Sequence, residues 1–160
     1  MIWQRAADMD LVDVETALLN GAVGDYAAEA AVLLLVNDGH WLPQLHAEGL
    51  ITLAVDGDEA GGPWADVDWA ALDGALAAGV LSGDERQRLL LRAAAGIADG
   101  GPLDLGDLLA GLDRRSLTLL LAALAHAAGS HEHREVSHDP DGVAHPGHKL
   151  PPLVPWPPRA

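Results

Sequence analysis

Apolar and polar residues follow a helical spacing through most of the first 129 residues. The segment 82–98 is the clearest case, because its apolar positions share one face: Leu89, Leu90, Ala93, Ala94 and Ile97. Ser82 followed by Glu85 is a capping box and predicts that this helix begins at Ser82. Caps and turn residues predict further helices over 10–20, 25–36, 69–78, 104–111 and 113–128, with a helical turn over 41–47.

One short region has the spacing of strands instead. Residues 50–55 are rich in β-formers, a glycine-rich loop follows, and residues 64–69 alternate between apolar and acidic side chains. We therefore expect a mainly α (α+β) protein, with a compact domain of about six helices and one small β-hairpin.

Two of the predicted helices are apolar on nearly every side. Only Glu29 interrupts residues 26–36, and only Ser116, Thr118 and His126 interrupt the second helix after its first turn. A domain of this size can enclose one such helix completely but hardly two. One helix should be central, and the other suggests a homodimer contact. His126 is expected to be a hydrogen-bonded core residue.

The composition changes at Gly129 and Ser130. Residues 130–160 hold seven of the ten prolines and five of the eight histidines, without helical or strand periodicity. Such a segment cannot bury enough surface to fold alone. The sequence thus predicts a globular domain over 1–129 and a flexible, disordered tail over 130–160, with polyproline II character near its end.

The tail carries two candidate binding features. Imidazoles interspersed with carboxylates suit Zn²⁺, Ni²⁺ or Cu²⁺, and here they are His131, His133, His138, His145 and His148. The preferred alternative is a solvated tail whose histidines change charge between about pH 5 and 8. Nearer the end, Pro152 and Pro155 make a PxxP step beside Trp156, which would suit an aromatic groove on a partner. A stiff, disordered end is the alternative there.

Charge is unevenly distributed along the chain. The formal net charge is −15, and residues 1–81 contain one basic residue, Arg5, against fourteen acids. This acidity disfavours nucleic-acid binding, because phosphate backbones are repelled. It would attract a basic protein partner. The alternative is an acidic surface that serves solubility alone.

No catalytic constellation is recognisable in the sequence. Cysteine is absent, the only lysine is Lys149 in the tail, and no serine lies in a Gly-x-Ser-x-Gly motif. Asp38, His40 and His46 are the residues an unrecognised active site would use. No apolar run approaches the roughly 20 residues that span a bilayer, and no signal-peptide stretch is present, so we expect a cytoplasmic protein without membrane contact.

Several short motifs are helix caps and turns spread over residues 28–129. They are Asp66-Val67-Asp68-Trp69, Leu81-Ser82 with Glu85, Gly101-Pro102-Leu103-Asp104-Leu105, Leu112-Asp113 and His126-Ala127-Ala128-Gly129. Together they resemble a family of small uncharacterised acidic helical proteins from GC-rich bacteria. The resemblance implies a bacterial, cytoplasmic protein and transfers no activity and no functional residue.

These observations favour a non-enzymatic protein–protein interaction or accessory protein. Two alternatives stay open. The first is an acidic inhibitor or immunity-type protein that occupies the basic site of a partner. The second is a transition-metal-binding protein that uses the histidines of the tail.

Overall fold

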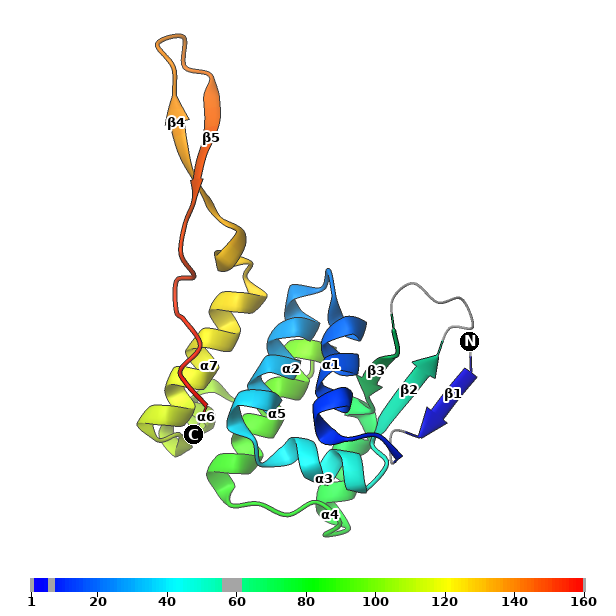
Figure 1. Ribbon diagram of the computed structural model, residues 1–160. Helices are drawn as coiled ribbons and strands as arrows, with labels where there is room; N and C mark the ends of the chain where they lie inside the picture. The colour runs from blue at the N-terminus through cyan, green and yellow to red at the C-terminus, as the bar shows by residue number, and fades with distance from the viewer. Residues whose placement is uncertain (1, 6–7, 56–61, 160) are drawn as a thin grey trace.

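A computed structural model describes residues 2–5, 8–55 and 62–159, which form seven α-helices and two small antiparallel sheets (Figure 1). In chain order the elements are β1 (Ile2–Arg5), α1 (Leu11–Ala22), α2 (Tyr26–Asp38), α3 (Trp41–Ala47), β2 (Ile51–Val55), β3 (Trp64–Val67), the 3-10 turn η2 (Trp69–Ala71), α4 (Leu72–Ala77), α5 (Glu85–Asp99), α6 (Leu105–Gly111), α7 (Arg114–Ala127), the 3-10 turn η3 (Ser130–Glu132), β4 (Arg134–His138) and β5 (Ala144–Lys149). The mainly helical class is confirmed. The helices number seven rather than about six because the predicted turn over 41–47 is a helix in its own right.

The expected hairpin of β2 and β3 belongs to a three-stranded sheet. Strand β2 pairs on one side with β3, where Leu53 lies opposite Ala65, and on the other side with β1, where Leu53 lies opposite Gln4. Strand β1 was not predicted, since four residues at the start of a chain carry too little pattern to identify a strand. The loop between β2 and β3 falls mostly outside the described residues.

Helix α2 is the enclosed centre of the body and packs against α1, α3, α5 and α7. Its buried side chains lie on all sides of the helix: Ala30, Ala31, Val32, Leu34, Leu35 and Val36. Asp25 begins the helix by accepting hydrogen bonds from the N–H groups of Ala27 and Ala28, and Gly39 ends it with a φ of 77°. Helix α7 covers one side of α2 and leaves Leu121 and Leu124 exposed on its own outer side.

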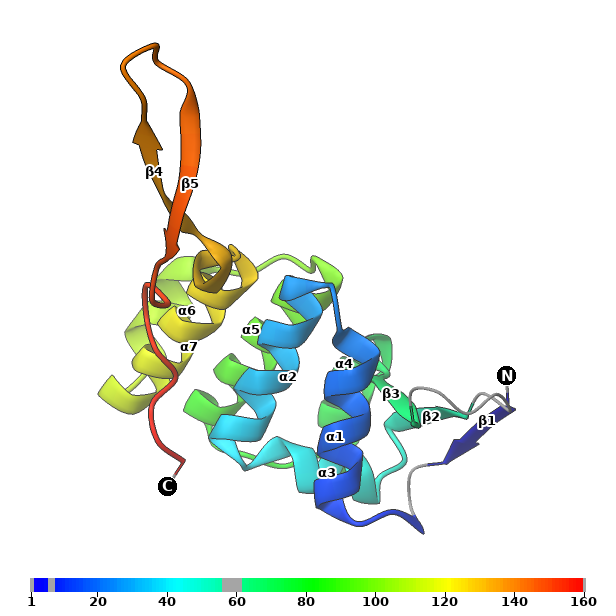
Figure 2. The same cartoon turned by 45° about the horizontal axis from the view of Figure 1, so that its top comes forward.

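The sheet lies against α1, on the side of the body away from α7 (Figures 1 and 2). Helix α1 and strand β3 approach each other closely at Gly21. A Cβ atom added there would lie 2.3 Å from the carbonyl oxygen of Ala65. Only glycine permits this backbone contact, which seats the sheet on the helices.

The N-cap of helix α5 lies two residues later than predicted. Asp84 is its N-cap: the Asp84 carboxylate accepts from the Gln87 N–H, and the Gln87 side chain accepts from the Asp84 N–H, each at 2.8 Å. The prediction that Ser82 caps this helix is therefore wrong. The Ser82 carbonyl instead accepts hydrogen bonds from the side chains of His40 and Gln44.

Arg86 joins the ends of three helices. Its guanidinium donates to Ser116 Oγ at 3.0 Å and lies 3.9 Å from Asp38 at the end of α2, 3.7 Å from the α5 cap Asp84, and 3.6 Å from the α7 cap Asp113. Burial raises the pKa of Asp38, and the His40 N–H and Arg86 offset this only in part. Hydrogen bonds from Ser116 hold the pKa of Asp113 below its usual value.

The segment after α7 differs from the disordered tail that we expected. Strands β4 and β5 form a hairpin, called here the arm (residues 134–149), which projects from the end of α7 (Figure 1). Residues 150–159, called here the strap, then return along α7. The strap is held by a hydrogen bond from the Leu153 N–H to Ser130 Oγ, by one from Arg115 to the Pro158 carbonyl, and by an ion pair between Arg159 and Glu15.

Within the described ranges, none of the helices combines the length and apolar character that crossing a membrane requires.

Two glycine substitutions test the packing of the sheet on α1. We expect Gly21→Ala to lower the free energy of unfolding by about 1–3 kcal/mol, because the added methyl group pushes α1 away from β3. Gly74→Ala in α4 is the matched control: no atom lies within 4 Å of its Cβ position, so it should raise stability by about 0.5–1 kcal/mol. Urea unfolding of the three proteins measures both effects. Equal stability of wild type and Gly21→Ala would contradict the close contact.

Ionisation of two carboxylates near Arg86 should change the free energy of unfolding in opposite directions. The folded state binds a proton at Asp38 more tightly than the unfolded chain does, so the Asp38 charge costs stability as the pH rises above about 4. Asp38→Asn should therefore be more stable than wild type at pH 7 and lose this advantage near pH 3.5, where the wild-type carboxyl is also largely uncharged. The measurement is urea unfolding at both pH values.

Asp113→Asn is the control for this pH experiment. Its lowered pKa means that the charged form contributes stability above about pH 4, and that this contribution is lost as the pH falls through the folded pKa. The variant keeps an N-cap oxygen, and solvent screens the exposed Asp113 charge, so we expect a small loss at pH 7, roughly 0.3 kcal/mol at most, that disappears at low pH. If Asp38→Asn were less stable than wild type at pH 7, the attraction between the Asp38 carboxylate and Arg86 would outweigh the cost of burying that carboxylate.

Candidate functional site

Three ionisable side chains from distant parts of the chain meet at the base of the arm. Glu29 lies in the first turn of α2, His126 in the last turn of α7, and His131 in η3. Gly129, with a φ of 72°, follows the end of α7 and changes the direction of the chain; its Cα lies so close to the Tyr26 ring that a Cβ there would be 3.2 Å from it. The turn into η3 brings the ring of His131 against the ring of His126.

The three side chains are in close contact. His126 Nε2 lies 2.9 Å from Glu29 Oε2, and the other oxygen of Glu29 accepts from the Gly24 N–H at 3.1 Å. The rings of His126 and His131 are stacked, with centroids 4.0 Å apart and an angle of 16° between their planes. One ligand atom of each of the three residues lies within 4.8 Å of those of the other two. The prediction that His126 is hydrogen-bonded is met, with Glu29 as the partner.

One nitrogen of this cluster has no partner. His131 Nδ1 is buried and forms no hydrogen bond within the described part of the chain, whereas His131 Nε2 lies 3.9 Å from Glu132. A buried polar atom without a partner costs about 1–3 kcal/mol. The cluster therefore has an unused electron-pair donor or N–H group directed into the protein.

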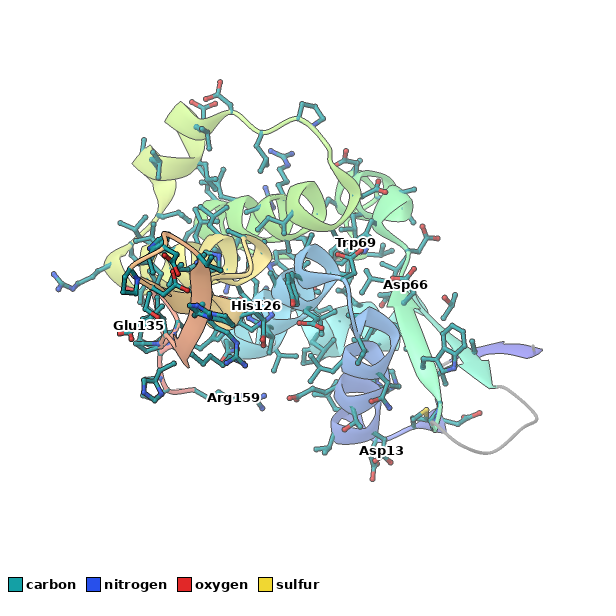
Figure 3. All side chains as sticks on the ribbon, turned by 90° about the horizontal axis from the view of Figure 1, so that it is seen from above. Asp13, Asp66, Trp69, His126, Glu135 and Arg159 are labelled. Carbon is teal, nitrogen blue, oxygen red and sulfur yellow. The ribbon has the colours of Figure 1, made fainter. Side chains whose placement is uncertain are left out.

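Aromatic side chains surround the cluster. The Tyr26 ring meets His131 edge-on at a centroid distance of 4.9 Å, and the Trp156 ring lies 6.3 Å from His126. The solvent-exposed fractions of the Glu29, His126 and His131 side chains are 22 %, 14 % and 20 %. Figure 3 shows His126 beneath the arm, beside α2. All three side chains of the site are thus half-buried.

The five histidines proposed as metal ligands are not brought together. Only His131 joins the cluster. His138, His145 and His148 lie on the arm with exposed side chains, and His133 is exposed just before it. His145 pairs with Asp139 across the turn of the arm, at 3.0 Å.

The proposed PxxP ligand is divided between two environments. Pro152 and Pro155 are exposed, whereas Trp156 is half-buried and packs against the hydrophobic core. Recognition through the prolines stays a prediction, but the tryptophan is already engaged within the chain.

The residues proposed for an unrecognised active site have structural contacts. Asp38 lies against Arg86, and His40 Nε2 lies 2.8 Å from the Ser82 carbonyl. His46 lies half-buried in the last turn of α3. Asp38 and His40 thus connect α2 and α3 with the start of α5.

A groove of about 760 Å³ lies between α4, α5 and the chain leading into α6. Trp69, Leu72 and Leu103 are among its apolar lining residues. Arg88 and Arg92 also line it, together with four aspartates, so the groove selects no single ligand charge.

Two features of the cluster were visible in the sequence without being connected. Glu29 is the one polar residue within the apolar run of α2, and His126 interrupts the apolar run of α7. Their pairing spans 97 residues, and no local pattern can predict a contact at that separation.

Comparison of the chain with protein-family models, with curated proteins and with solved structures found no match.

Proposed function

We propose that this protein is a non-catalytic protein–protein interaction protein and that the arm is its recognition element. The observation that carries the proposal is the exposure of the arm. Every side chain of β4 is exposed, and so is every residue of β5 except Gly147. The arm therefore contributes nothing to the core of the body from which it projects.

A two-stranded hairpin of this length is at best marginally stable in water. Val136 and Val143 keep 61 % and 54 % of their exposure, so the arm has no apolar face that is buried within the chain. A third strand supplied by a partner would cover such side chains and satisfy free backbone groups. The arm has the properties of an incomplete sheet.

The two outer edges of the arm are not equivalent. The Asp139 N–H donates to the Val143 carbonyl, so the register makes Ser137 and His145 a hydrogen-bonded pair and leaves the backbone groups of Val136 and Pro146 facing outward. Pro146 has no N–H, which interrupts the outer edge of β5. The outer edge of β4 keeps its backbone donors at Val136 and His138. We assign the partner strand to β4.

The acidic half of the chain supports a different contact, with a basic partner. Asp10, Asp13 and Asp73 are exposed on or next to α1 and α4, in the part of the sequence that has a single basic residue. The inhibitor or immunity-type alternative would use this surface and would leave the arm dispensable. Leu121 and Leu124 on α7 are the surface that a homodimer would use. A bacterial, cytoplasmic origin stays a prediction.

Affinity capture from a lysate of the native host tests this assignment. Tagged full-length wild type is compared with Val136→Pro, which removes one outward N–H of β4, and with Val136→Ala, which keeps it. We expect a stoichiometric partner that binds wild type and Val136→Ala and binds Val136→Pro at least about tenfold more weakly, a loss of about 1.4 kcal/mol. Affinities are then measured with the purified partner.

A third variant, Asp10→Asn/Asp13→Asn/Asp73→Asn, distinguishes the two surfaces. If it loses the partner while Val136→Pro retains it, the acidic surface is the binding site and the assignment to the arm is wrong. Circular dichroism and thermal melting establish that each variant keeps the helical body. Capture of no partner by wild type would also refute the proposal.

A further inference from the structure

We infer that Glu29, His126 and His131 bind one divalent transition-metal ion of the zinc class. The inference does not depend on the proposed function, because it concerns the base of the arm and not the β4 edge. It also differs from the site expected in the tail: two of its three ligands belong to the helical body, and four of the five tail histidines take no part.

The ligand set and its dimensions fit such an ion. Imidazole nitrogen and carboxylate oxygen are ordinary ligands of Zn²⁺, at about 2.0–2.2 Å, which places ligand atoms about 3.4 Å apart around a tetrahedral ion. The three ligand atoms already lie within 4.8 Å of one another, and His126 Nε2 lies 2.9 Å from Glu29 Oε2. Closure requires the ligand atoms to approach by roughly 1 Å, and it requires the two stacked imidazoles to rotate out of their near-parallel arrangement, because a metal ion lies in the plane of each ring that binds it. Water would complete the coordination.

The contacts around the site orient the carboxylate of Glu29 as a metal site requires. The Gly24 N–H holds Oε1 of Glu29 and leaves Oε2 directed towards His126. Tyr26 contacts the ring of His131, and Trp156 lies near the ring of His126. The carboxylate is thus held in place before the ion arrives, whereas the two imidazoles turn towards the ion as it binds.

A hydrogen bond between Glu29 and His126 explains those two residues without a metal, but it does not explain His131. His131 is stacked on His126 with Nδ1 buried and unpartnered within the described residues. A metal ion at this point uses the Nδ1 electron pair and recovers the cost of burying it. Metal binding would also replace the stacking of the His126 and His131 rings by coordination of both imidazoles to the ion.

The ion would connect three elements. Glu29 belongs to α2, His126 to α7 and His131 to η3, which leads through His133 directly into β4. Binding would therefore fix the base of the arm to the body.

The test uses the full chain, first stripped of metal with a chelator. Isothermal titration with ZnCl₂ at neutral pH should show one ion per chain with a dissociation constant on the order of 1 µM or lower, near −8 kcal/mol. Co²⁺ should give the strong visible absorption of a four-coordinate site. His131→Ala and Glu29→Gln should each weaken zinc binding at least about tenfold, and the same zinc concentration should raise their melting temperature less than it raises that of wild type.

The matched control is His138→Ala/His145→Ala/His148→Ala, which removes the arm histidines and leaves the cluster intact. It should bind zinc as wild type does. If instead this variant loses the ion while His131→Ala keeps it, flexible arm histidines are the ligands and the inference is wrong. It is equally wrong if wild type binds no zinc. Neither result bears on partner binding at β4, which is measured without metal.

Discussion

The structure depends on the burial of α2, a helix without a polar face. An apolar helix of this kind is stable in water only when other elements cover every side of it. Helices α1, α3, α5 and α7 supply that cover, and the three-stranded sheet reaches the core through α1. Within α2 the charged residues are thereby confined to its first and last turns, at Glu29 and Asp38.

The two carboxylates of α2 lie near its opposite ends, and the helix dipole treats them differently. Glu29 in the first turn is favoured by the positive end of the dipole, whereas Asp38 in the last turn is opposed by the negative end. The Arg86 guanidinium lies beside the Asp38 carboxylate and favours its charged form. Burial is the larger effect, so the pKa of Asp38 is still raised. Glu29 requires no cation and is left to interact with His126. The end of α2 at Asp38 therefore contacts the start of α5 through Arg86. The end at Glu29 has a carboxylate that is available to His126.

Local signals predict the helices well and predict contacts between distant segments poorly. Asp25, Asp104 and Asp113 cap the helices expected of them, because an N-cap acts on N–H groups only two or three residues away. Around Ser82 two capping patterns overlap, and Asp84 with Gln87 is the pair that forms. Strand β1 and the arm have no apolar alternation that could reveal them. His131 reaches His126 through the turn at Gly129, which composition does not show.

The order of the arm has to come from its base, since its own side chains bury nothing. The strap returns the chain to the body, so the arm is a loop whose two ends are held together. Ser130 joins the start of the segment to Leu153, Trp156 packs against the core, and Arg159 pairs with Glu15 of α1. Holding the ends of a loop removes much of the conformational entropy that ordering would otherwise cost. A metal ion at His131 would act on the same base and by the same physical means. It would restrict the direction in which the β4 edge is presented without occupying that edge, so a partner strand and a metal ion could be bound at the same time.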